Sequence, residues 1–98
     1  MRCKTAGELY DVIDRIAPFS TQCEWDNSGL LVGSADSKVN SIGVVLDITV
    51  EAIEKARSLG IDTIVAHHPV IFRPISNIPV GSPVYLLVKY GMTAVCSH

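Results

Sequence analysis

A chain of 98 residues is long enough for one small domain. Hydrophobic residues make up 48% of it and charged residues 18%, and the net charge at pH 7 is −2. Because basic residues form no cluster, the composition argues against nucleic acid as a partner, and no apolar run approaches the roughly 20 residues of a membrane span. The charged start of the chain is not typical of a signal peptide, and three scattered cysteines indicate a reducing cytoplasm.

The first predicted element is a helix that begins at Thr5 and ends before Pro18. Thr5 is followed three residues later by Glu8, which is the pattern of a capping box, and proline cannot continue a helix. A polar, turn-rich stretch over residues 20–34, "STQCEWDNSGLLVGS", then leads into the short apolar run Leu30–Val32. This stretch predicts a connecting segment.

The rest of the chain alternates strand and helix. We expect strands at 40–48, 61–66 and 93–97, a helix from Thr49 to Gly60 between the first two strands, and a helix at 84–90 between the last two. Two successive βαβ units imply parallel strands with right-handed crossovers. We therefore predict an α/β fold for residues 1–98 as a single domain, with a parallel βαβαβ sheet and flanking helices.

Polar side chains that can bind metals stand at the ends of all three strands. Asp47 ends the first strand, the pair His67 and His68 in "VAHHPVIF" follows the second, and His98 follows the third. Parallel strands end at the same edge of a sheet, where ligands bind in such folds, so these residues should gather there. Neutral imidazole is a common ligand of zinc, iron and manganese-type centres, usually beside carboxylates.

The adjacent histidines also predict a geometry. Neighbouring residues on an extended strand point to opposite sides, and Pro69 keeps His68 out of the helical region. The rings of His67 and His68 are therefore expected to diverge. Diverging rings favour two ions about 3.5–4 Å apart over one shared ion.

Each candidate residue also has a purely structural interpretation. The adjacent histidines could belong to a partly exposed loop, and His98 could have no role. Asp47 could cap the second helix or bond to a neighbouring turn. Cys96, two residues before His98, could be a thiolate ligand, but a small buried core residue is the favoured interpretation.

Four segments resemble the family of GTP cyclohydrolase 1 type 2 homologues, also described as dinuclear metal-centre proteins. The segments are "EWDNSGLLVG", "VVLDIT", "VAHHPVIF" and the strand end "CSH", and they occur in the family's order at fitting intervals. The resemblance implies an α/β fold, a dinuclear divalent metal site and toroidal hexamers. It also implies that His67, His68 and His98 are metal ligands.

The sequence departs from the family pattern at its C-terminal side. In the family, a ligand aspartate comes four residues after the last of these histidines, and a further histidine and glutamate, three apart, come from near the end of a chain well over twice as long. The 98 residues contain none of these. The resemblance thus implies the N-terminal part of a larger α/β domain, with at most one ion of zinc, iron or manganese in place of the family's two.

These expectations favour the N-terminal part of a metal-dependent hydrolase acting on a nucleotide-like substrate, inactive in isolation, with Asp47 as the candidate substrate-binding residue. The sequence identifies no catalytic acid or base. Two alternatives stay open, namely a metal-stabilised interaction or regulatory protein without catalysis, and an inactive fragment. High apolar content and an open edge at the last strand predict a homo-oligomer.

Overall fold

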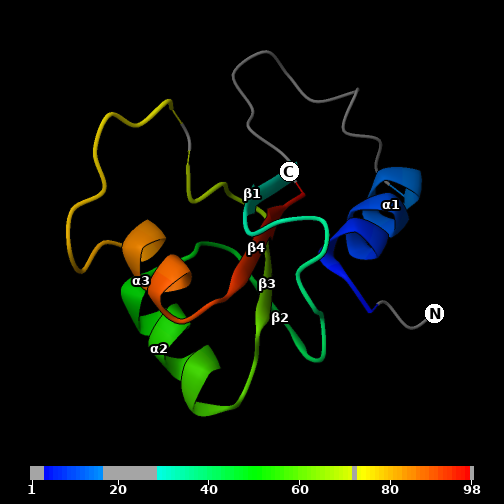
Figure 1. The fold of residues 1–98 in the computed structure, drawn as a ribbon, viewed down its shortest axis with the longest axis horizontal. Coiled ribbons are helices and arrows are strands. Elements are labelled where there is room, and N and C mark those ends of the chain that lie inside the picture. The colour runs from blue at the N-terminus through cyan, green and yellow to red at the C-terminus, as the bar shows by residue number, and fades with distance from the viewer. Residues whose placement is uncertain (1–3, 17–28, 72, 98) are drawn as a thin grey trace.

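The computed structural model describes residues 4–16, 29–71 and 73–97, and apart from one additional strand its elements follow the predicted order (Figure 1). They are α1 (Ala6–Ile16), β1 (Gly29–Val32), β2 (Ile42–Val45), α2 (Val50–Ser58), β3 (Thr63–Ala66), α3 (Pro83–Lys89) and β4 (Thr93–Cys96). Most of the segment "EWDNSG" and the residue His98 lie outside the described residues.

Helices α1 and α2 begin where their predicted capping residues place them. The Thr49 hydroxyl accepts a hydrogen bond from the backbone N–H of Ala52 at 3.1 Å, which makes Thr49 the N-cap of α2. At α1, the backbone N–H of Glu8 donates to the Thr5 hydroxyl at 3.3 Å. Helix α3 starts one residue earlier than predicted because Ser82 caps it, and proline suits the first helical position.

The sheet is mixed, which corrects the prediction of a purely parallel sheet. Its strand order is β1-β4-β3-β2, in which β2, β3 and β4 are parallel as predicted, but β1 pairs antiparallel with β4. The run Leu30–Val32, expected only as part of a connection, supplies this strand. The predicted open edge at β4 is therefore wrong, and in the described part of the chain the sheet edges are β1 and β2.

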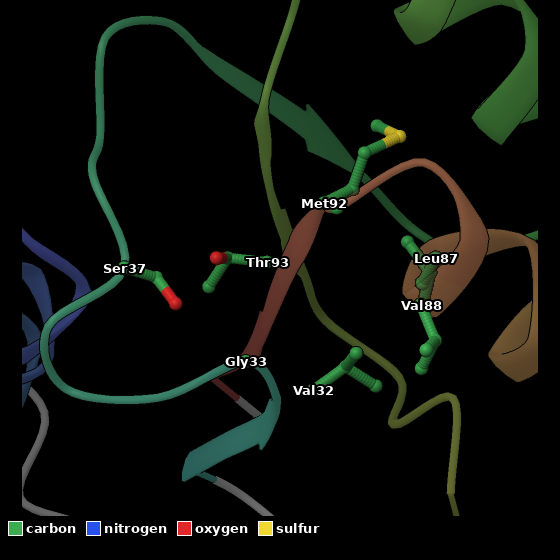
Figure 2. Close-up of a pocket in the computed structure, with 8 residues that line it drawn as sticks. Val32, Gly33, Ser37, Leu87, Val88, Met92 and Thr93 are labelled. Carbon is green, nitrogen blue, oxygen red and sulfur yellow. The ribbon is translucent and has the colours of Figure 1, made fainter.

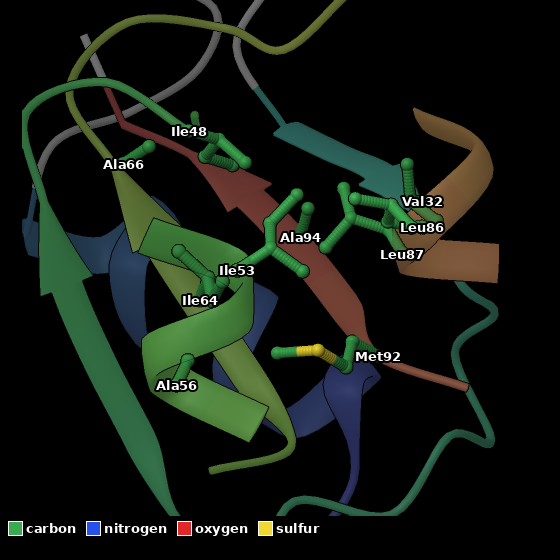
Figure 3. Packing of buried hydrophobic residues seen from close by; sticks show 10 residues of the cluster. All are labelled: Val32, Ile48, Ile53, Ala56, Ile64, Ala66, Leu86, Leu87, Met92 and Ala94. Carbon is green, nitrogen blue, oxygen red and sulfur yellow. The ribbon is translucent and has the colours of Figure 1, made fainter. Parts of the chain in front are cut away.

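Helices cover both faces of the sheet (Figure 1). On one face, α2 and α3 pack over β3 and β4, with Ile53, Leu87 and Ala94 fully buried in one apolar cluster (Figure 3). On the other face, α1 contributes Leu9, which packs with Val95 of β4. Burial on both faces explains why β3 and β4 are almost continuously apolar rather than alternating.

A carboxylate ties the start of β2 to the start of β3. Asp62 accepts hydrogen bonds from the backbone N–H groups of Asn40 and Ser41 and from the Thr63 hydroxyl. Partial burial works against the charged form, but these hydrogen bonds outweigh it and hold the pKa of Asp62 below its ordinary value. Asp62 thus stabilises the parallel register of β2 and β3 where both strands begin. The same register determines which residues lie side by side where both strands end.

Candidate metal centre

The adjacent histidines lie at the carboxyl edge of the sheet, where the prediction placed them. Strand β3 ends at Ala66, and the chain continues into His67 and His68. The backbone N–H of His67 donates to the carbonyl of Val45 at 3.2 Å, and that of His68 donates to the carbonyl of Leu46 at 2.9 Å. Hydrogen bonding between β2 and β3 therefore continues past both strands and holds the backbone of the pair.

The two rings lie side by side, which corrects the prediction that they diverge. The ring centroids of His67 and His68 are 4.9 Å apart, and the ring planes are inclined at 47°. Side-chain alternation holds only for extended backbone, and the chain bends at these two residues. Divergence of the rings therefore does not argue against a shared ion.

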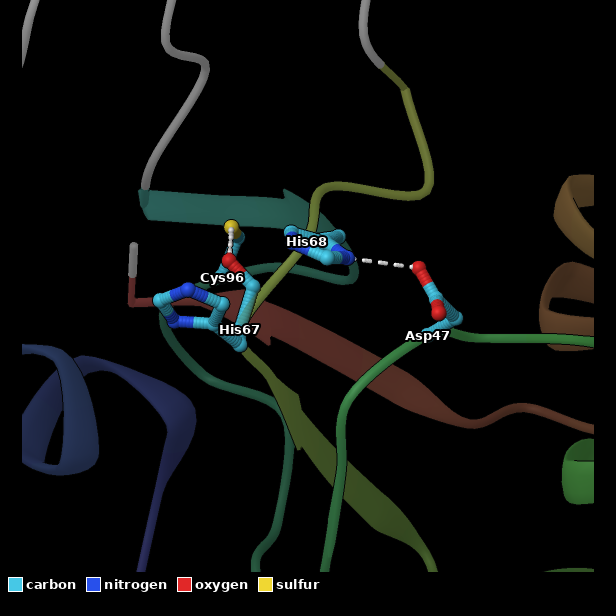
Figure 4. A network of polar contacts seen from close by, with 4 residues as sticks. All are labelled: Asp47, His67, His68 and Cys96. Atoms are coloured by element: carbon cyan, nitrogen blue, oxygen red, sulfur yellow. Dashed lines mark hydrogen bonds and ion pairs between the residues drawn. The ribbon is translucent and has the colours of Figure 1, made fainter.

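Asp47 lies beside His68 at the same edge (Figure 4). Its Oδ1 is 2.8 Å from Nδ1 of His68, and the side chains of His68 and Asp47 are 45% and 58% exposed. Thr49, not Asp47, is the N-cap of α2, so the capping interpretation of Asp47 is wrong. Two segments 21 residues apart in sequence are thus joined through a carboxylate and an imidazole.

Cys96 supports the backbone of this edge from β4. Its side chain is 1% exposed, and its thiol donates to the carbonyl of His67 at 3.3 Å (Figure 4). The interpretation as a buried core residue is confirmed.

Strand β4 leads to the same edge as β3, because the backbone N–H of Ser97 donates to the carbonyl of Ala66 at 2.9 Å. The position of His98, the next residue, lies outside the described ranges. Among the described residues, no three His, Cys, Asp or Glu side chains converge in a way that could hold a metal ion. The possible ligands at this edge are two neighbouring imidazoles, one of which contacts a carboxylate through Nδ1. These ligand types suit a zinc or iron ion, but the described residues supply fewer ligands than such an ion needs.

A cavity of about 240 Å³ lies at the other end of the sheet (Figure 2). It is lined by Val32, Gly33, Ser37, Leu87, Val88, Gly91, Met92 and Thr93. Thr93 is the first residue of β4, whereas His67 and His68 follow the last residue of β3. The cavity is therefore separate from the histidines and contains no imidazole or carboxylate.

The fold and this edge define an α/β protein that presents paired histidines beyond the ends of parallel strands. The chain belongs to the Duf34/NIF3 (NGG1p interacting factor 3) family, whose sequence model matches residues 4–98. It is 33% identical over 95 residues to a Staphylococcus aureus (strain Mu50 / ATCC 700699) protein named GTP cyclohydrolase 1 type 2 homolog, a match that covers 94% of this chain and 26% of that protein. The resemblance to that group of homologues is confirmed.

Solved structures show the same fold. A crystal structure of the Staphylococcus aureus hypothetical protein SA1388 matches with a TM-score of 0.91 and 31% identity, over 98% of this chain and 28% of that one. Reduced HcgD from Methanocaldococcus jannaschii matches with a TM-score of 0.86 and 30% identity, over 96% of this chain and 39% of that one. The chain thus spans well under half the length of these relatives.

Within the described ranges, no helix has the length and apolar character needed to cross a membrane.

Proposed function

We propose that the chain binds one divalent metal ion at the carboxyl edge of the sheet, with His67, His68 and His98 as ligands. The observation that carries the proposal is the pair of neighbouring rings, 4.9 Å apart, held at the strand ends by backbone hydrogen bonds. A zinc, iron or manganese ion held there would supply a Lewis acid for hydrolysis. The 98 residues offer no further ligands at the expected spacing, so the proposal is limited to one ion per chain.

The proposed reaction class is hydrolysis of a nucleotide-like substrate. Its support is the name of the relatives, GTP cyclohydrolase 1 type 2 homolog, and the chain covers 26% of the first of them. Hydrolysis is therefore proposed for a complete protein of this family and not for these 98 residues alone. Asp47 is a candidate contact to the substrate. In such a protein, His67, His68 and His98 would bind the ion, and Asp47 would help to orient the substrate.

A second candidate function is a metal-stabilised, self-associating protein without catalysis. One specific observation favours it, namely an apolar stripe on the edge strand β2 and just beyond it. Ile42, Val44 and Leu46 are 43%, 80% and 61% exposed. Apolar side chains on an open sheet edge are typical of surfaces that associate, so a homo-oligomer is proposed in either case.

Calorimetric titration of the metal-free protein with Zn²⁺ tests metal binding. We expect a single weak site per chain, because three imidazoles leave coordination positions that water would fill. Metal analysis after dialysis should agree with at most one ion per chain. Two ions per chain, or no heat and no retained metal, would contradict the proposal. Nucleotide turnover by a zinc-loaded protein that covers the full length of the relatives separates the hydrolase from the association function.

A further inference from the structure

His68 makes both a backbone and a side-chain contact with the residues that follow β2. One is the backbone hydrogen bond from the N–H of His68 to the carbonyl of Leu46, at 2.9 Å. The other is the side-chain contact between Oδ1 of Asp47 and Nδ1 of His68, at 2.8 Å. The first fixes the backbone from which the ring extends, and the second fixes the rotation of the ring itself. Together they favour one orientation of the His68 ring.

We propose that Asp47 is a positioning residue for the metal centre, which directs His68 to bind the ion through Nε2. A carboxylate only accepts hydrogen bonds, so Nδ1 of a neutral His68 must carry the proton in this contact. The Nε2 atom then has the lone pair that a metal ion requires. This inference rests on the proposed metal-binding function and extends it to a residue behind the ligands.

The same geometry argues against Asp47 as a ligand of that ion. Nδ1 and Nε2 face different sides of an imidazole ring, so an ion on Nε2 lies across the ring from the Asp47 carboxylate. Oδ1 of Asp47 would have to leave Nδ1 before it could reach the ion. Carboxylates that accept the second ring N–H of a ligand histidine fix its tautomer and raise its basicity, and their loss typically weakens metal binding by about 10–100-fold.

The exposure of the pair sets the size of the expected effect. Because the side chains of His68 and Asp47 are 45% and 58% exposed, water competes for the same hydrogen bond. We therefore expect the lower end of that range, about a tenfold loss of Zn²⁺ affinity in D47A. D47N should stay within about threefold of the wild type, because its amide oxygen can still accept the Nδ1 proton.

The test has a readout in the metal-free protein. Long-range ¹H–¹⁵N spectra of the histidine rings at a pH where His68 is neutral should show the proton on Nδ1 in the wild type and in D47N. In D47A, the signals should move toward the tautomer with the proton on Nε2, which neutral imidazole side chains favour in water. The signals of His67 should stay unchanged in all variants. Glu51, an exposed carboxylate in the first turn of α2, provides the matched control, and E51A should leave the tautomer and the Zn²⁺ affinity unchanged.

The ring spectra and the zinc titration distinguish two failures. If the wild type binds no Zn²⁺ but D47A shifts the His68 tautomer, the metal-binding proposal fails and the orienting contact stands. If Zn²⁺ binds but D47A leaves the tautomer and the affinity as in the wild type, the role of Asp47 is overturned. A wild-type His68 with its proton on Nε2 would overturn it as well.

Discussion

Replacing His67 and His68 together with alanine should reduce Zn²⁺ affinity by more than about a hundredfold. The loss of a residue that only supports a ligand costs about 10–100-fold, and the loss of two ligands costs more. The remaining proposed ligand, His98, would hold an ion only weakly as a single imidazole. Calorimetric titration of the double variant beside the wild type measures the effect, and replacing His98 as well should abolish binding.

The folded state of this double variant serves as its control. His67 is exposed, and the His68 side chain is 45% exposed, so both alanines should leave the core intact. The backbone hydrogen bonds from His67 and His68 to β2 do not depend on the side chains. The free energy of unfolding should therefore change by less than about 0.5 kcal/mol, as for most surface substitutions. If the double variant bound zinc as tightly as the wild type, His67 and His68 would not be ligands of the ion.

The largest effect on stability is expected for L87A. Leu87 has no exposed surface and lies in the apolar cluster between the sheet and helices α2 and α3 (Figure 3). Removing its side chain should cost about 3 kcal/mol, since buried leucine-to-alanine substitutions cost about 2–5 kcal/mol through lost burial and the cavity they leave. For a domain of this size, the loss corresponds to a decrease in Tm of about 12–24 °C.

The neighbouring residue provides a matched control for L87A. Val88 is on the same helix but is 63% exposed, so V88A should change stability by less than about 0.5 kcal/mol. Urea unfolding followed by circular dichroism measures both variants. Equal losses for L87A and V88A would mean that the face of α3 assigned to the core is not the buried one.

Much of the fold could be predicted because local signals determine it. Thr5 and Thr49 precede helices and their hydroxyls accept backbone hydrogen bonds, and the alternation after residue 40 predicts the parallel strands. The antiparallel strand β1 could not be predicted in the same way. An apolar run as short as Leu30–Val32 does not indicate which strand it will pair with, or in which direction.

The site could be predicted in location but not in detail. The carboxyl ends of parallel strands meet at one edge, so the proximity of Asp47 to the histidines follows from topology. The distance between the rings of His67 and His68 depends on where β3 ends, because alternation stops at Ala66. The contact between Asp47 and His68 depends on how the chain turns after β2, for which the sequence carries no clear signal.

The measurement that tests metal binding most directly is anomalous X-ray scattering at the zinc edge, from crystals of the protein grown with Zn²⁺. We expect one anomalous peak per chain at the carboxyl edge of the sheet, about 2.0–2.1 Å from ring nitrogens of the proposed ligands. For His68, the bonded atom should be Nε2, with Asp47 remaining on Nδ1. Zinc that is found only away from His67 and His68, or an edge without any peak at saturating zinc, would contradict the account.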